Sequence, residues 1–112
     1  MTGYERIQAA LSGKQPDKTP IMLHNFMMAV SEAGYTMEQF RNDPRVIAEC
    51  FIRAVEKYQY DGVVVDIDTV TLAGACGVNV DFPKTEPARS HEGILASLAE
   101  VDQLKPVDIQ SY

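Results

Sequence analysis

Apolar residues recur at every third or fourth position between Pro44 and Tyr58, and this spacing predicts an amphipathic helix. Asp43 and Pro44 mark its start, because aspartate caps helices and proline suits the first helical position. The apolar side comprises Val46, Ile47, Cys50, Phe51, Ala54, Val55 and Tyr58. Most charged residues lie off this stripe, so we expect the helix to pack one face against a core.

Two shorter helices are indicated by capping boxes, in which a threonine is followed three residues later by glutamate or glutamine. Thr2 and Glu5 start a helix over residues 2–12. Thr36 and Gln39 start another, shortly before the long helix. Both pairs place a side-chain oxygen where the first backbone N–H groups of a helix need an acceptor.

Other segments carry weaker helix signals. Residues 27–33 are either a loop or a short helix that ends near Gly34. The segment 69–76 is predicted to form a short helix. Ser90 stands where it would cap a last helix over residues 90–101.

Three strand signals alternate with these helices. The first is the apolar segment 21–26. Three consecutive valines follow a turn pair at 61–62 and predict a buried strand over residues 63–67. Residues 78–82 alternate in polarity like a third, short strand, and a proline-bounded loop is expected at 82–89.

The alternation of strands and helices predicts an α/β fold built from βαβ units with parallel strands. Two main strands do not complete a parallel sheet, which is normally covered on both faces and flanked by neighbours. We therefore expect an N-terminal fragment of a (β/α)₈ TIM barrel, which takes about 250 residues. The whole chain, 1–112, is then one partial barrel domain, with an N-terminal helix at 2–12, the first βα units at 21–80 and a trailing helix at 90–101.

Composition narrows the functional classes. The chain has 112 residues and a net charge of −6, which argues against nonspecific nucleic-acid binding. No apolar run approaches the ~20 residues that span a bilayer, and no signal peptide is recognisable, so we expect no membrane partner. The two cysteines, Cys50 and Cys76, are far apart, which favours a reduced, cytoplasmic setting.

Candidate chemistry lies at the predicted strand ends, where parallel α/β folds carry their sites. Asp66 and Asp68 are two positions apart and would share one face of an extended strand. Asp68 is equally suited to cap the following helix. His24 at the end of the first strand either binds a substrate or is a hydrogen-bonded histidine under a loop.

Metal binding has little support in the sequence. His24, His91, Cys50 and Cys76 lack the close spacing of structural zinc sites, so no metal ligand is assigned. Cys50 lies on the apolar helix stripe and is expected to be a small buried hydrophobe. Met27, beside a second methionine, is expected to line a pocket or to pack in the core.

Three motifs, taken in order, resemble the N-terminal part of the uroporphyrinogen decarboxylase (URO-D) superfamily. The opening motif runs from Tyr4-Glu5-Arg6 through Ala10-Leu11 to Gly13-Lys14-Gln15-Pro16-Asp17-Lys18-Thr19-Pro20. The second, Tyr60 to Asp68, is similar to the second barrel strand, which ends in an active-site aspartate. The third is Ala75-Cys76-Gly77-Val78. This resemblance implies the (β/α)₈ fold.

The resemblance places the active-site aspartate at Asp68, which we expect to be catalytic. In the decarboxylases this carboxylate binds the pyrrole N–H groups of the substrate at the barrel mouth. We expect His24, Asn25, Met27 and Asp66 to bind substrate nearby.

The chain departs from the decarboxylases after the first strand. They carry an arginine-rich segment there, whereas residues 24–30 contain no arginine. Arginines would be needed to bind the carboxylates of uroporphyrinogen. The resemblance is therefore closer to the cobalamin-dependent methyltransferase branch, for which a zinc ion and a corrinoid are implied in the full-length enzyme.

Three functions stay open at this stage. The first is corrinoid-dependent methyl transfer by the full-length enzyme, on a small-molecule or corrinoid-protein substrate, with this chain alone inactive. The second is uroporphyrinogen decarboxylation. The third is a non-catalytic module that associates with itself or a partner through unpaired strand edges.

Overall fold

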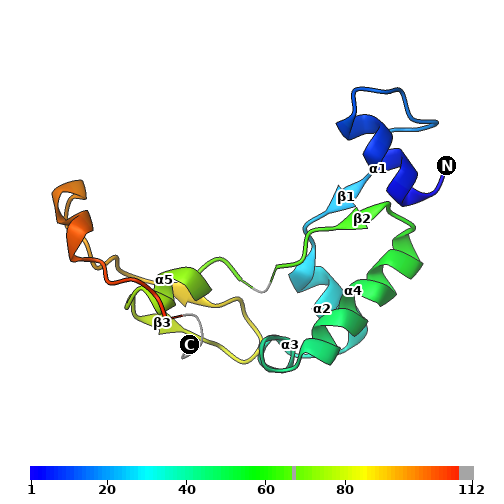
Figure 1. Ribbon diagram of the computed structural model, residues 1–112. Coiled ribbons are helices and arrows are strands. Elements are labelled where there is room, and N and C mark those ends of the chain that lie inside the picture. The colour runs from blue at the N-terminus through cyan, green and yellow to red at the C-terminus, as the bar shows by residue number, and fades with distance from the viewer. Residues whose placement is uncertain (67, 109–112) are drawn as a thin grey trace. The chain divides into compact units, whose positions relative to one another are not determined.

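The chain forms two compact units, Met1–Ile67 and Asp68–Tyr112 (Figure 1). This computed structural model describes residues 1–66 and 68–108. The first unit contains α1 (Gly3–Leu11), β1 (Met22–Leu23), α2 (Phe26–Ala33), α3 (Met37–Asn42), α4 (Pro44–Tyr58) and β2 (Gly62–Val63). The second contains α5 (Thr71–Ala75), β3 (Val80–Asp81), β4 (Arg89–Ser90) and the 3₁₀ helix η1 (Leu98–Gln103).

The helices of the first unit begin where their local signals predict. Both capping boxes form, with the side chains of Thr2 and Thr36 each accepting a hydrogen bond from the third helical N–H. The carboxylate of Asp43 accepts from the N–H of Arg45 at 2.8 Å, and α4 has the predicted bounds. Residues 26–33 take the helical alternative, and α2 ends at Gly34 in the left-handed conformation (φ 81°) that glycine favours.

Strands β1 and β2 are parallel, with Met22 opposite Gly62 and Leu23 opposite Val63. This pairing confirms the predicted parallel arrangement of the first two strands. The helices α2 and α4 lie beside each other below this pair in Figure 1. Leu23 and Val63 pack against the core that these helices form.

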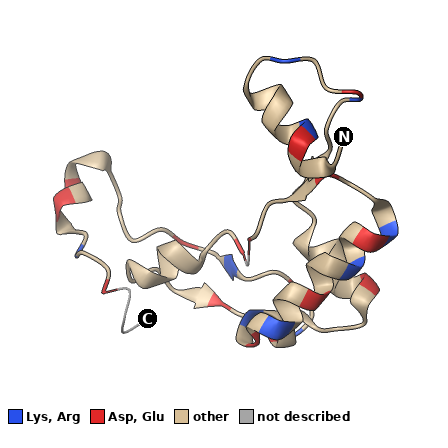
Figure 2. Cartoon of the chain, turned by 45° about the vertical axis from the view of Figure 1, so that its right-hand side comes forward, with Lys and Arg blue, Asp and Glu red and all other residues tan. Residues whose placement is uncertain are grey.

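The core of the first unit lies mainly among α2, α3 and α4. Phe40 is fully buried, with its ring centroid 6.0 Å from that of Phe51 and 6.4 Å from that of Phe26. Cys50 is buried as predicted. The remaining core residues are Ala29, Val30, Met37, Ala54 and Tyr60. Outside this core, α4 carries charged residues of both signs (Figure 2). Among them, Arg53 forms an ion pair with Glu49 one turn earlier in the helix.

Both strands of the first unit are shorter than predicted. The segment 21–26 yields only β1, because Phe26 already belongs to α2. The predicted buried strand 63–67 ends at Val63, and Val65 is 71% exposed, so the prediction of three buried valines is wrong. The N–H of Val64 still donates to the carbonyl of Leu23 at 3.1 Å, but the chain beyond Leu23 turns away into α2, which begins at Phe26. Ile67 lies outside the described residues.

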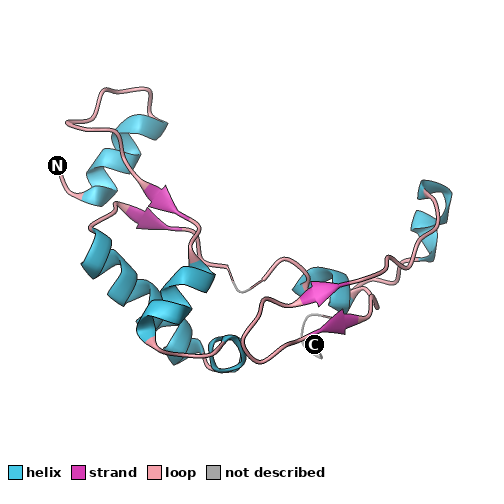
Figure 3. Cartoon of the chain, turned by 180° about the vertical axis from the view of Figure 1, so that it is seen from behind, coloured by secondary structure: helices cyan, strands magenta, loops and turns pink. Residues whose placement is uncertain are grey.

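The second unit contains an antiparallel strand pair, in which Val80 lies opposite Ser90 and Asp81 opposite Arg89 (Figure 3). The prediction that segment 78–82 adds to a parallel sheet is therefore wrong. A short connection such as 82–88 returns the chain antiparallel, whereas a parallel crossover needs a dozen residues or more. The expected loop at 82–89 is this connection, except that Arg89 belongs to β4.

The predicted trailing helix at 90–101 is also wrong. Ser90 pairs in β4 instead of capping a helix, and its hydroxyl donates to the carbonyl of Glu92 at 2.9 Å. Helical structure appears only as η1, from Leu98. Leu98, the first residue of η1, is 89% exposed. The predicted helix 69–76 is present in shortened form as α5.

Candidate functional site

The carboxyl ends of β1 and β2 carry a histidine–aspartate pair. His24 directly follows β1, and Asp66 follows β2 after two valines. Because the strands are parallel, both residues lie at the same edge of the pair. The Nε2 of His24 lies 2.7 Å from Oδ2 of Asp66, and their side chains are 45% and 30% exposed. The His24 ring also lies 5.3 Å from the ring of Phe26.

Asn25 and Met27 flank this pair at the start of α2. Asn25 is the N-cap residue, and its Oδ1 accepts a hydrogen bond from the hydroxyl of the buried Tyr60 at 3.3 Å. Its Nδ2 is buried and has no partner among the described residues. Met27 is 47% exposed in the first turn of α2. Sequence reasoning named all of these residues, and the first unit brings His24, Asn25 and Asp66 to one end of its strand pair.

Asp68 belongs to the second unit and organises the start of α5. Its Oδ1 accepts from the N–H groups of Val70 and Thr71 at 2.8 and 2.6 Å. Its Oδ2 accepts from the hydroxyl of Thr71 at 2.7 Å. The N-cap residue of α5 is Val70 and not Asp68 as the alternative expected, although the Asp68 carboxylate binds the backbone at the start of α5. The catalytic role of Asp68 stays a prediction. The expected shared face of Asp66 and Asp68 spans Ile67, which lies outside the described residues.

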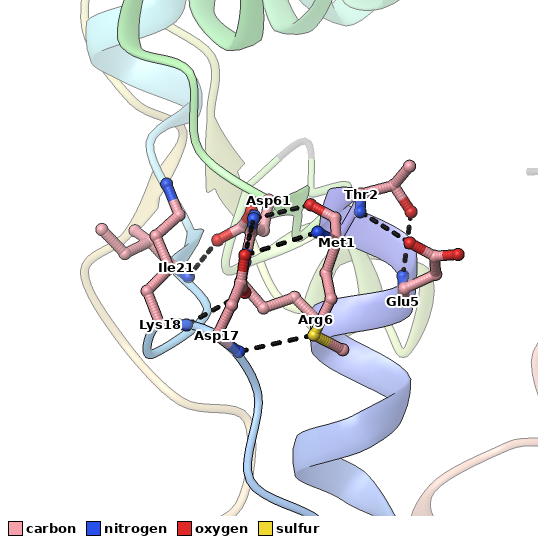
Figure 4. A network of polar contacts seen from close by, with 8 residues as sticks. All are labelled: Met1, Thr2, Glu5, Arg6, Asp17, Lys18, Ile21 and Asp61. Carbon is pink, nitrogen blue, oxygen red and sulfur yellow. Dashed lines mark hydrogen bonds and ion pairs between the residues drawn. The ribbon is translucent and has the colours of Figure 1, made fainter.

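An ion-pair network at the opposite ends of the strands was not foreseen from the sequence (Figure 4). Arg6 of α1 is buried and contacts Asp17 through Nε at 2.5 Å, and it also binds Asp61. Asp61 precedes β2 and accepts from the N–H of Ile21, which precedes β1, at 2.9 Å. Local patterns do not report such contacts, because Arg6 and Asp61 are 55 positions apart.

The helix α1 approaches β2 closely at this end. A Cβ atom on Gly3 would lie 2.7 Å from the carbonyl oxygen of Asp61, so only glycine fits there without a shift. A Cβ on Gly62 would lie 2.9 Å from Cδ1 of Ile7. The network therefore fixes α1 against the amino ends of the strands.

The network shifts the pKa values of its members. The hydrogen bond from Arg6 lowers the pKa of Asp17 well below its usual range. The N–H of Ile21, followed by the Arg6 guanidinium, lowers the pKa of Asp61. The hydrogen bond to Asp17, followed by that to Asp61, raises the pKa of Arg6. All three groups are charged at neutral pH.

The second unit contains an open cavity of about 420 Å³. Its lining includes Cys76 at the end of α5 and Lys105 beyond η1. Apolar side chains of Ile94, Leu95, Leu104 and Val107 form much of the remaining wall. Sequence reasoning did not anticipate this cavity.

Comparison with known protein families identifies the family of the chain. A family model for uroporphyrinogen decarboxylase (URO-D) matches residues 2–111. The chain belongs to the URO-D family. This membership confirms the resemblance seen in the sequence. Searches of curated proteins and of solved structures gave no significant match.

The URO-D match spans nearly the whole chain and therefore both units. The mixed α/β structure, with short strands between helices, is consistent with membership of this family. For a URO-D family chain, Asp68 is the position to which the resemblance assigns the active-site carboxylate. His24, Asn25 and Asp66 are the polar residues that the structure itself gathers.

A zinc ion, which the methyltransferase branch of the URO-D superfamily implies, does not fit the residues described. Across residues 1–66 and 68–108, no three His, Cys, Asp or Glu side chains are arranged to hold a metal ion. We derive no metal chemistry from this part of the chain. The helices described here include none that is long and apolar enough to cross a membrane.

Proposed function

We propose that this chain supplies the first βα units of a (β/α)₈ barrel in an enzyme of the URO-D superfamily, and that the full-length enzyme transfers a methyl group from a corrinoid substrate. The observation that carries the proposal is the His24–Asp66 pair at the carboxyl ends of two parallel strands. Active sites of (β/α)₈ enzymes lie at this end of the strands, whereas the opposite end serves stability.

The two ends of the strand pair in the first unit differ in the way that a barrel enzyme requires, with stabilising contacts at one end and candidate site residues at the other. The Arg6 network holds α1 at the amino ends of β1 and β2, and the partly exposed His24 and Asp66 lie at the carboxyl ends. In the parts of the chain that the structure describes, β1 and β2 pair only with each other. Further strands would complete the sheet in a full barrel.

Methyl transfer is favoured over decarboxylation by the charges around the site. Uroporphyrinogen carries many carboxylates, and a pocket for it needs fixed cations. Residues 24–30, which follow β1, contain no lysine or arginine. Elsewhere in the unit, Arg6 is bound to two aspartates and Arg53 to Glu49.

Uroporphyrinogen decarboxylation is the second candidate, and the match to the URO-D family supports it. The Asp68 carboxylate would then bind pyrrole N–H groups, as the resemblance implies. In that case the cations for the substrate carboxylates would come from parts of the enzyme beyond residues 24–30.

An assay of the full-length protein separates the two reactions. One arm supplies methylcobalamin and a thiol, and follows the loss of the methylcobalamin absorbance. The other arm supplies uroporphyrinogen and analyses the products by chromatography. We expect methyl transfer without decarboxylation. Decarboxylation alone would establish the second candidate, and activity in neither arm would refute both.

Variants connect the activity to the site. We expect His24→Ala and Asp66→Asn to lower methyl transfer by about 10²-fold or more, which is typical for loss of a group that moves or orients a proton. The exposed His91 of the second unit provides the matched control, and His91→Ala should keep wild-type activity. Equal losses in all three variants would contradict a site at His24.

A non-catalytic role remains as a third proposal, supported by exposed apolar residues beside the strand pair. Met22 is 53% exposed and Val65 is 71% exposed. In this role the chain would associate through the edges of β1 and β2. Analytical ultracentrifugation tests it, and a well-folded monomer at high concentration would count against it.

A further inference from the structure

We propose that the N-terminal strap, residues 1–20 with α1, can detach from β1 and β2 while the core among α2, α3 and α4 stays folded. The strap lies at the amino ends of the two strands, opposite to His24 and Asp66. The proposal therefore goes beyond the proposed methyl transfer and does not depend on it. It makes the attachment of α1 a reversible step of its own in the first unit.

The strap shares little apolar surface with that core. In α1, which the structure describes throughout, Arg6 is the one buried residue, whereas Tyr4 and Leu11 are 73% and 78% exposed. The described residues that form the core, and those packed against it, all lie between positions 23 and 63. Because apolar burial is the main force that holds a fold together, the core can persist without α1.

The contacts between the strap and the strands centre on Asp61, which precedes β2. The guanidinium of Arg6 binds its carboxylate. Gly3 lies against its backbone, since a Cβ atom on Gly3 would be 2.7 Å from the carbonyl oxygen of Asp61. Ile7 packs beside Gly62, where a Cβ atom would be 2.9 Å from Cδ1 of the isoleucine. An ion pair and a close backbone approach thus hold α1 against β2.

The other polar contacts of Arg6 lie within the strap (Figure 4). Its Nε lies 2.5 Å from Asp17, and its Nη2 donates to the carbonyl of Met1 at 2.6 Å. On release, Arg6 keeps these partners, and Asp61 keeps the N–H of Ile21, which it accepts at 2.9 Å. Neither charge is left buried without a partner, so detachment avoids the large penalty for an unpaired buried charge.

Detachment should also unwind α1. The helix has nine residues, whereas isolated helices shorter than about 12–15 residues are marginal in water. In the docked chain the N–H of Ser12 donates to the carbonyl of Gln8 at 3.1 Å, and helical hydrogen bonds of this kind protect the amides of α1. Their exchange with solvent deuterium therefore reports the detached state, and the amides of α4 report opening of the core.

Two variants weaken the docking in different ways. Gly3→Ala places a methyl group against Asp61 but leaves every charge, and alanine favours a helix more than glycine does. A loss of α1 protection in this variant therefore cannot come from weaker helix propensity. Asp61→Asn removes the charge that binds Arg6 and retains an oxygen that can accept the N–H of Ile21. Gly93→Ala is the matched control, since a Cβ atom on Gly93 meets nothing within 4 Å.

The test is hydrogen exchange of the full chain, followed by NMR at increasing urea concentrations. In the wild type we expect α1 amides to be at least about tenfold less protected than α4 amides, with a weaker dependence on urea. We expect Gly3→Ala and Asp61→Asn to lower the protection of α1 at least about tenfold further. The amides of α4 should stay protected in both variants and lose no larger a factor than those of α1. Gly93→Ala should match the wild type.

Three results would overturn the proposal. Equal protection and equal urea dependence of α1 and α4 in the wild type would show that the first unit opens only as a whole. Wild-type protection of α1 in both Gly3→Ala and Asp61→Asn would show that Asp61 does not hold the strap. Complete loss of α4 protection in Gly3→Ala would show that the core requires the docked strap.

Discussion

The guanidinium of Arg6 binds the carboxylate of Asp61, and this ion pair joins α1 to the residue that precedes β2. The same carboxylate accepts the N–H of Ile21 just before β1. The Asp61 carboxylate therefore holds the amino ends of both strands. His24 and Asp66 lie at the opposite, carboxyl ends.

Removing the cation should destabilise the first unit. Arg6→Ala leaves the Asp61 side chain, which is only 5% exposed, as a buried charge with fewer partners. We expect the thermal midpoint to fall by about 5 °C or more. Circular dichroism measures the change, and Arg45→Ala is the control because Arg45 is exposed in the first turn of α4. Equal midpoints for the two variants would show that the ion pair contributes little.

Acid should weaken the same network. The pKa values of Asp17 and Asp61 are lower in the folded chain than in the unfolded one, so the unfolded chain binds more protons as the pH falls. Their contribution is fully present above the unfolded pKa, about 3.9, and is lost as the pH falls from there through the folded pKa values. Urea midpoints between pH 7 and pH 3 measure this loss.

The double variant Asp17→Asn/Asp61→Asn should be less stable at pH 7 and should lose less stability on acidification. Asp102→Asn is the matched control, because Asp102 is exposed in η1. A double variant with the wild-type dependence on pH would place the acid-sensitive carboxylates elsewhere.

Substitutions at Asp68 should separate its structural role from its predicted catalytic role. Asp68→Ala removes the acceptor for the N–H groups of Val70 and Thr71 at the start of α5, and each such hydrogen bond contributes about 0.5–1.5 kcal/mol. Asp68→Asn retains an acceptor oxygen but not the charge. Hydrogen exchange should show the Val70 and Thr71 amides protected in the wild type and Asp68→Asn, but not in Asp68→Ala.

The activity of the full-length protein tests the predicted catalytic role of Asp68. If the carboxylate binds substrate, Asp68→Asn should lose activity although α5 is intact. Wild-type activity in Asp68→Asn would leave Asp68 with its structural role alone.

The two cysteines should differ in reactivity. Cys50 is fully buried in the core, and desolvation raises the pKa of its thiol. Cys76 is partly exposed and lines the cavity of the second unit. A thiolate is the reactive form, so a disulfide reagent should label Cys76 in the native chain and both residues after denaturation. Cys76→Ser should abolish native labelling, and residual rapid labelling would show that the core opens readily.

The position of three candidate residues at one end of the strand pair was predictable from the sequence, but their contacts were not, and their role in binding stays a prediction. His24, Asn25 and Asp66 were identified because polar residues at the ends of parallel strands gather at one edge. The hydrogen bond between His24 and Asp66 depends on the register of β1 and β2, which places residues 42 positions apart beside each other. The Arg6–Asp61 pair was missed for the same reason.

The sequence by itself determined α1, α3, α4 and the family, whereas it left a loop and a helix open for the segment that forms α2. The capping boxes at Thr2 and Thr36 and the Asp43-Pro44 start act within a few residues, so the local chain suffices to predict them. The sequence also predicted that the first two strands are parallel, but only the tertiary structure decided where the strands end and that β3 pairs antiparallel with β4. A strand needs a neighbouring strand to accept and donate its backbone hydrogen bonds, so β2 ends at Val63 despite the valines that follow. For the same reason Ser90, which has a partner in β3, forms part of β4 instead of capping a helix.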